Sequence, residues 1–247
     1  MTQVAEIVGG SEELFVVKDH GRMRIIVINR PLARNALTRQ MRRDFPAYIR
    51  SADQDESVAA VILTGMGSAF SAGVDLKERA HGAPQPPVVP NPAEVLSASR
   101  KPVIAAVNGA CVTGALEIAL SCSFIVASDQ ARFADTHATL GLAPRWGQSA
   151  RLPDAIGLRR ARQLMLTGAF IDAPTALAWG LVNEVVPQAQ LLERCLQIGE
   201  SIARAHPDAV AEQLAVSRAV EADILAAGME AERGSCTRLG SVPRRSP

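Results

Sequence analysis

Short apolar runs separated by turns fill the first quarter of the chain. Within residues 13–29, two such runs flank a tight turn, which predicts a β-hairpin. The run 58–63 contains only aliphatic side chains, as is typical of a parallel strand that is buried on both faces. Between these segments, Thr38 is a suitable N-cap for a helix that extends to about Ala52. This order predicts a strand–helix–strand unit.

The middle of the chain continues the alternation of strands and helices, and the last third is mostly helical. Residues 101–107 predict a buried strand, and the stretch 107–120 predicts that this strand passes directly into an apolar helix. Residues 80–92 carry five prolines and predict a loop, either over a pocket or at the plain surface. Further strands are predicted at 123–127, 132–134 and 181–186, and helices at 157–166, 173–179, 190–205 and 208–226.

The composition is ordinary for a soluble globular protein, because 48% of the residues are hydrophobic and 21% are charged, and 247 residues suffice for one large α/β domain or two small ones. A formal net charge of +1 and the lack of a dense Lys/Arg block argue against nucleic acid or an anionic membrane surface as the main partner. No apolar run approaches the ~20 residues that span a bilayer, and the N-terminus lacks a signal-peptide pattern. We therefore expect a cytoplasmic protein with no membrane partner.

The cysteines and glycines do not form a known metal or phosphate motif. Cys111, Cys122, Cys195 and Cys236 include no CxxC pair and no histidine at metal-ligand spacing, so we expect reduced thiols and no metal site. The glycine-rich stretch 64–77 lacks both the GxxxxGK(S/T) pattern and the third glycine of GxGxxG. Its Gly-Val step can instead present a bare backbone N–H to a ligand.

Glu117 is the first candidate for chemistry. It is the only acidic residue between Lys101 and Asp129, and it lies within the apolar helix predicted up to residue 120. A carboxylate in such surroundings is costly unless it has a partner or a function. We expect its polar partner to be a substrate or a water molecule.

Four segments, taken in order and spacing, carry a resemblance to a known family. The chain resembles the crotonase (enoyl-CoA hydratase/isomerase) superfamily from about Val16 to Val186. The segments are Asn29-Arg30-Pro31 through Asn35-Ala36-Leu37, Leu63-Thr64-Gly65 through Phe70-Ser71-Ala72-Gly73-Val74-Asp75-Leu76-Lys77, Lys101-Pro102-Val103-Ile104-Ala105-Ala106-Val107-Asn108-Gly109, and Leu166-Thr167-Gly168 through Trp179-Gly180-Leu181-Val182-Asn183.

The resemblance implies an α/β fold in which ββα units form a spiral, followed by a helical oligomerisation region. On this basis we expect a core with the acyl-CoA site at 1–187 and a C-terminal helical region at 188–247. The implied assembly is a homotrimer or a dimer of trimers. The implied partner is an acyl-CoA thioester, which is the substrate, and no cofactor is required.

The resemblance also implies roles for individual residues. Family members hold the thioester oxygen of an enolate with two backbone N–H groups, which fall on Val74 and Gly114. Gly114 stands at the predicted start of the helix that carries Glu117, where unsatisfied N–H groups favour a developing negative charge. Glu117 matches the glutamate that steers water onto the β-carbon. The implied CoA and substrate contacts are Ala33, Arg34, Ala72, Gly73, Asp75 and Lys77.

Three features depart from the family. The second glutamate, which exchanges the α-proton, falls on His137 in Phe133-Ala134-Asp135-Thr136-His137. His137 either serves this acid/base role or is a packed residue beside a site that works with Glu117 alone. Asp135 either orients His137 or points away, and Trp146 either narrows the acyl pocket or is structural. The tail 240–247 lacks the family's ending, which puts a CoA contact from it in doubt.

Three functions remain open at this point. The first is hydration of a trans-2-enoyl-CoA by Glu117 and His137 with the oxyanion donors Val74 and Gly114. The second is a 3,2-enoyl-CoA isomerase, which needs only one carboxylate to move a proton between carbons. The third is a non-catalytic acyl-CoA binding protein that keeps the pocket.

Overall fold

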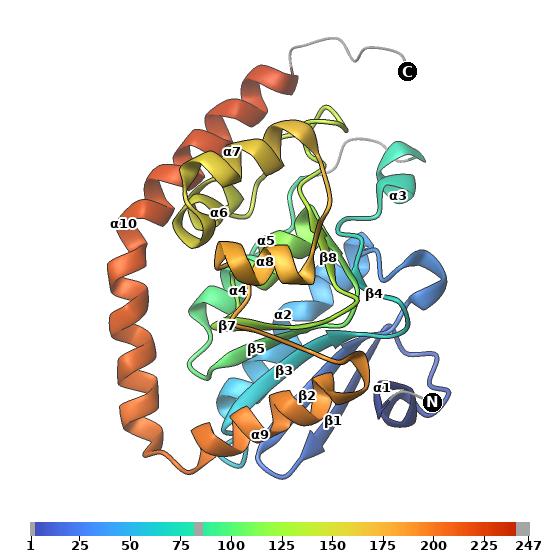
Figure 1. The fold of residues 1–247 in the computed structure, drawn as a ribbon, viewed down its shortest axis with the longest axis vertical. Coiled ribbons are helices and arrows are strands. Elements are labelled where there is room, and N and C mark those ends of the chain that lie inside the picture. The colour runs from blue at the N-terminus through green and yellow to red at the C-terminus, as the bar shows by residue number, and fades with distance from the viewer. Residues whose placement is uncertain (1–2, 82–85, 241–247) are drawn as a thin grey trace.

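Two β-sheets form the centre of the computed structural model, which describes residues 3–81 and 86–240 (Figure 1). The six-stranded sheet contains, in spatial order, β1 (Phe15–His20), β2 (Met23–Ile28), β3 (Ala60–Gly65), β5 (Val103–Val107), β7 (Phe124–Ser128) and β10 (Glu184–Val186). The four-stranded sheet contains β4 (Ala69–Ser71), β6 (Ala110–Val112), β8 (Arg132–Ala134) and β9 (Ile171–Asp172).

The N-terminal part of the chain folds as its pattern predicts. Strands β1 and β2 form an antiparallel hairpin, and β3 returns parallel to β2 after helix α2 (Arg39–Gln54). The Thr38 hydroxyl accepts the N–H of Met41, so the predicted N-cap is confirmed. Burial of Met41, Phe45 and Ile49 on one face of α2 fixes the helix against the sheet.

Successive ββα units build the spiral. Strands β3, β5 and β7 of the large sheet are each followed by a short strand of the small sheet, β4, β6 and β8, and then by helix. Because β4, β6 and β8 pair in parallel, each unit lies one step further along the same direction. The helices that follow are α3 (Leu76–His81), α4 (Pro92–Ala98), α5 (Gly114–Leu120) and α6 (Gln148–Ile156).

The predicted direct passage from strand to helix within 107–120 is wrong, because β6 lies between β5 and α5. The three residues of β6 are apolar, as are the residues of β5 before it and most residues of α5 after it, so the hydrophobic pattern shows no boundary that would separate this strand from the helix. The proline-rich stretch is likewise shorter than predicted, because α4 starts at Pro92 behind an Asn91–Glu94 capping box. The segment 82–85 within it lies outside the described residues.

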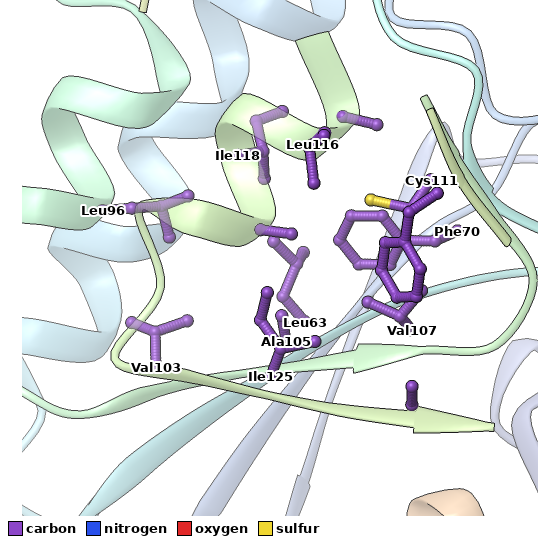
Figure 2. Packing of buried hydrophobic residues seen from close by; sticks show 14 of the residues in the cluster. Leu63, Phe70, Leu96, Val103, Ala105, Val107, Cys111, Leu116, Ile118 and Ile125 are labelled. Carbon is purple, nitrogen blue, oxygen red and sulfur yellow. The ribbon is translucent and has the colours of Figure 1, made fainter. Parts of the chain in front are cut away.

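The core between the sheets and the helices is mostly aliphatic, with a few buried phenylalanines such as Phe70 and Phe133. Figure 2 shows Leu116 and Ile118 of α5 directed toward strand residues such as Leu63 and Val107. Residues 114–119 of α5 are all buried, so this short helix lies entirely within the protein. Its position is therefore fixed by packing, and any polar side chain that it carries is removed from water.

The C-terminal helices cover the outside of the spiral. They are α7 (Leu158–Thr167), α8 (Ala173–Trp179), α9 (Leu191–Ala203) and α10 (Pro207–Gly240), while α1 (Gln3–Val8) lies at the N-terminus. Leu191, Leu192 and Cys195 of α9 pack into a cluster with residues of β2, β3 and β5. Figure 1 shows α10 along one side of the molecule, next to α6, and α10 extends well beyond the predicted 208–226.

Two properties of the described residues bear on the earlier expectations. No helix among them is long and apolar enough to cross a membrane. Cys111, Cys122 and Cys195 are free thiols, as expected. Burial raises the pKa of Cys122 and Cys195 to about 12, so both remain protonated near neutral pH.

Candidate active site

Glu117 is held inside the protein by the loop that precedes α6. Its side chain is 3% exposed, and its Oε1 accepts the backbone N–H of Arg145 at 3.1 Å and of Trp146 at 2.7 Å. The expectation that only substrate or water would bind this carboxyl is therefore wrong. These donors could not be predicted, because every residue other than proline has a backbone N–H group and only the fold decides where it points. The second oxygen, Oε2, lies 3.7 Å from Nε2 of His137.

The surroundings of Glu117 favour its protonated form. Burial raises its pKa from 4.5 to about 7, and the nearby charge of Glu232 acts in the same direction. His137 and the two backbone N–H groups oppose this rise. A carboxyl with a pKa near 7 can both accept and release a proton at neutral pH.

His137 is fixed by Asp135, so of the two alternatives left open for Asp135 the structure has the one in which it contacts the ring. Nδ1 of His137 lies 2.7 Å from Oδ1 of Asp135, and the same oxygen accepts the backbone N–H of His137 at 3.0 Å. Both side chains are buried. Because a carboxylate only accepts, Nδ1 carries a proton and the opposite ring nitrogen, Nε2, faces Glu117. The position to which the resemblance assigns a second carboxyl thus carries a His–Asp pair in this chain.

The backbone N–H groups of Val74 and Gly114 lie close together. A Cβ built on Gly114 would stand 3.5 Å from the nitrogen of Val74, and one built on Gly73 would stand 3.0 Å from the nitrogen of Gly114. In the described part of the chain neither N–H has a backbone acceptor. Two such donors, one of them at the start of α5, can bind a single anionic oxygen.

Thr113, which immediately precedes Gly114, has an unusual backbone conformation with φ 56° and ψ −112°. A β-branched residue rarely has a positive φ, which costs roughly 1–3 kcal/mol. The Thr113 hydroxyl lies 2.5 Å from that of Thr136 and accepts the Thr136 N–H at 3.2 Å. The loop that carries His137 therefore also fixes the peptide before Gly114, a role that the sequence did not reveal.

Gly73 is predicted to tolerate no side chain. It has φ +83°, and a Cβ would lie 2.8 Å from the carbonyl oxygen of Val112 and 3.0 Å from the nitrogen of Gly114. We expect Gly73→Ala to lower the free energy of unfolding by about 1–3 kcal/mol and to lower turnover, since the Val74 and Gly114 donors must separate. Chemical denaturation and steady-state kinetics measure both effects.

Gly21→Ala is the matched control. Gly21 also has a positive φ, of +56°, but a Cβ there would meet nothing within 4 Å. The control should therefore show the backbone strain without the loss of turnover. Equal turnover of the two variants would contradict the importance of this contact.

The predicted CoA-contact residues lie along two adjacent segments. Ala33 is half-buried and Arg34 is exposed in the turn after β2, and the carbonyl of Arg34 accepts the N–H of Ala72. The carbonyl of Gly73 accepts the N–H of Leu37, which joins this turn to the Gly73–Val74 peptide. The two segments and the start of α5 thus form one continuous region.

Asp75 and Lys77 differ in how far their side chains are exposed. Oδ2 of Asp75 pairs with Arg30 at 2.5 Å, and its Oδ1 accepts the N–H groups of Lys77 and Glu78 at the start of α3. Burial opposes ionisation of Asp75, but Arg30 and these N–H groups outweigh it and lower its pKa. The Asp75 side chain is therefore committed to the protein, whereas the Lys77 side chain is exposed.

A spiral of ββα units in which a buried carboxyl with a pKa of about 7 lies beside paired backbone N–H groups is the arrangement of crotonase-fold enzymes. Comparison with known proteins agrees. The family described as Enoyl-CoA hydratase/isomerase matches residues 20–244. The chain therefore belongs to the enoyl-CoA hydratase/isomerase family.

Individual relatives span nearly the whole chain. It is 40% identical over 230 residues to a probable enoyl-CoA hydratase of Rhizobium meliloti, which covers 90% of this chain and 88% of that protein. It is 36% identical over 220 residues to a short-chain-enoyl-CoA hydratase of Clostridium acetobutylicum, covering 85% and 83%. A crystal structure of enoyl-CoA hydratase from Mycobacterium tuberculosis H37Rv superposes with a TM-score of 0.86 at 40% identity, over 93% and 100% of the two chains.

Proposed function

We propose that this enzyme adds water to a trans-2-enoyl-CoA thioester, with Glu117 and His137 as the two acid/base groups. The observation that carries the proposal is the buried pair itself, in which Oε2 of Glu117 and Nε2 of His137 are 3.7 Å apart. Hydration needs one group that takes a proton from water and one that gives a proton to carbon. The names of the relatives support the same reaction.

The proposed cycle starts from the Glu117 carboxylate and the His137 imidazolium, which Asp135 stabilises. Glu117 takes a proton from water while the water oxygen bonds to the β-carbon. The electron pair of the double bond moves toward the thioester oxygen, where the N–H groups of Val74 and Gly114 stabilise the enolate. His137 then gives its proton to the α-carbon, and the proton on Glu117 returns to His137 across the short gap between them.

The alternative in this family is a 3,2-enoyl-CoA isomerase that uses Glu117 alone. The specific observation in its favour is that a histidine, rather than a second carboxylate, faces Glu117. Assays of the purified protein with crotonyl-CoA and with a 3-enoyl-CoA separate the two reactions. Formation of a 3-hydroxyacyl-CoA from crotonyl-CoA supports hydration, whereas conversion of only the 3-enoyl thioester supports isomerisation. Binding without turnover of either would indicate a non-catalytic acyl-CoA binding protein.

Trp146 is proposed to limit the acyl chain. Its ring carbon Cζ3 would lie 3.2 Å from a Cβ on Gly114, so the indole packs against the proposed oxyanion donor. We expect Trp146→Ala to raise kcat/KM for a longer 2-enoyl-CoA relative to crotonyl-CoA by about 10-fold or more, since each accommodated methylene contributes roughly 1–3 kcal/mol. The backbone N–H that binds Glu117 remains in this variant. An unchanged ratio would show that the ring does not bound the acyl site.

CoA binding is assigned to the exposed cations beside the Gly73–Val74 peptide. Arg34 and Lys77 are proposed to contact the phosphates, and the CoA thioester is proposed as the substrate of an enzyme that requires no cofactor. The enzyme is proposed to act in the cytoplasm.

The enzyme is also proposed to assemble as a homotrimer or a dimer of trimers. Val216, Val220 and Ile224 recur every four residues on α10 and are all exposed, which leaves an apolar stripe for a second copy to cover. Multi-angle light scattering measures the mass, and a monomer at micromolar concentration would exclude this assembly.

A further inference from the structure

Glu232 is a buried carboxylate on α10, far along the chain from the proposed catalytic residues. Its side chain is 3% exposed. Oε2 accepts the N–H of Gly147 at 3.0 Å, and Oε1 accepts the N–H and the hydroxyl of Ser149 at 2.9 and 2.6 Å. A carboxylate with three donors at the start of α6 is a strong cap for that helix.

One face of α10 keeps Glu232 in register with α6. Glu221, Leu225, Gly228 and Glu232 follow a four-three-four spacing and therefore share this face. A Cβ on Gly228 would lie 2.5 Å from the Cβ of Ala150, so only glycine permits this close approach of the two helices. Glu221 pairs with Arg151 of α6 at 3.0 Å. This ion pair fixes the same face of α10 about three helical turns before Glu232.

The turn that Glu232 holds is the turn that binds Glu117. Arg145 and Trp146 donate their N–H groups to Oε1 of Glu117, and the next residue, Gly147, donates its N–H to Glu232. Arg151 donates to the carbonyl of Trp146 at 3.2 Å. Three consecutive peptides are therefore held between a carboxylate of α5 and a carboxylate of α10.

We propose that Glu232 is a positioning residue for the proposed acid/base group, because it fixes the 145–147 turn whose N–H groups hold the Glu117 carboxylate. On this inference, α10 helps to fix the geometry of the active site. The inference rests on the proposed function of Glu117, and the experiment below includes a measurement that does not depend on turnover.

The charges around this turn determine the expected pH effect. His137 faces Glu117 from the loop after β8, and Glu232 faces it from α10, while the Arg151 guanidinium lies next to the turn and pairs with Glu221. The Glu232 charge raises the pKa of Glu117. A neutral side chain at 232 that keeps the turn in place should therefore lower the pKa of Glu117.

The test compares Glu232→Ala with Glu230→Ala, an exposed acid on the same helix. The protein has two tryptophans, so Trp179→Phe leaves Trp146 as the single indole fluorophore of the turn. In this background we expect E232A to shift the Trp146 emission and to lower kcat for crotonyl-CoA by about 10- to 100-fold, as a small misplacement of a catalytic group does. The dissociation constant of butyryl-CoA should stay within about twofold, as for a group that acts on the chemical step. The E230A variant should match the Trp179→Phe parent in Trp146 emission, in kcat and in the dissociation constant of butyryl-CoA.

Glu232→Gln keeps one carbonyl oxygen, which can still accept the N–H of Gly147, and should recover part of the lost kcat. The acidic limb of the pH profile of kcat should move to lower pH in this variant. Removal of the negative charge at position 232 lowers the pKa of Glu117, which this limb reports. Parental emission and kcat in folded E232A, or an equal loss in E230A, would overturn the inference, as would an unmoved limb in E232Q. Failure of the proposed function would appear separately, as full activity of a Glu117→Gln enzyme.

Discussion

Replacing Glu117 by glutamine is expected to lower kcat for the hydration of crotonyl-CoA by about 1000-fold or more. Glutamine cannot take the proton of the attacking water, and loss of a positioned base typically costs about 100- to 10,000-fold. Its amide oxygen can still accept the N–H groups of Arg145 and Trp146, so the loop should stay in place. Steady-state kinetics and calorimetric titration with butyryl-CoA should show lost turnover with the affinity within about twofold.

The same variant should change how stability depends on pH. The pKa of Glu117 is raised from 4.5 to about 7 in the folded protein, so the native state binds one more proton than the unfolded state between these values. Stability that is present below pH 4.5 is therefore lost as the pH rises to 7. Because each pKa unit corresponds to about 1.4 kcal/mol, Glu117→Gln should exceed the wild type by a few kcal/mol at alkaline pH and approach it in acid. Urea denaturation across this range measures the difference.

An undiminished rate of hydration in Glu117→Gln would contradict the assignment of Glu117 as an acid/base group. A stability difference that does not change with pH would instead show that the carboxyl is not held near its neutral form. The two readouts are independent, since denaturation does not involve substrate.

The second large effect is expected at His137. We expect His137→Gln to lower hydration of crotonyl-CoA by about 100- to 1000-fold, since the variant lacks the group that gives a proton to the α-carbon in the proposed cycle. Asp135→Asn keeps an oxygen for the ring and for the backbone N–H of His137 but removes the charge that stabilises the imidazolium. The hydration rate should therefore fall less in Asp135→Asn than in His137→Gln. Initial rates for both variants, with butyryl-CoA binding as the control for a preserved site, measure the order of these effects.

Retained hydration in His137→Gln would show that the histidine is dispensable. Conversion of a 3-enoyl-CoA in that variant, without hydration of crotonyl-CoA, would favour the single-carboxyl isomerase.

The long elements of the fold could be predicted because each contains several repeats of its own period. The helix after Thr38 and the 173–179 helix begin at side chains with a clear local role, namely the N-caps Thr38 and Asp172. The strands β4, β6 and β9 have two or three residues, and only pairing with distant segments defines them. Such pairing is a tertiary property that no local pattern contains.

The site likewise contains residues whose arrangement could be predicted and others whose role only the fold reveals. The approach of Glu117 to His137 and of Val74 to Gly114 followed from the family resemblance, because these residues occupy matching motifs. The donors of Arg145 and Trp146 were invisible since they are backbone groups. Glu232 lies 85 residues from Gly147 in a helix of mixed composition, where a buried acid looks like any surface glutamate. The positive φ of Thr113 was hidden for a different reason, since threonine is the residue type least expected there.

Thr113 also restricts the order in which this part of the sequence can evolve. Its hydroxyl contact with Thr136 offsets a backbone conformation that threonine does not adopt readily. A lineage that first exchanged Thr136 would keep the strain and lose the contact, whereas one that first acquired glycine at position 113 would lose the strain and free Thr136 to vary. We therefore expect positions 113 and 136 to be energetically coupled, with Thr136 free to vary at lower cost once position 113 is glycine.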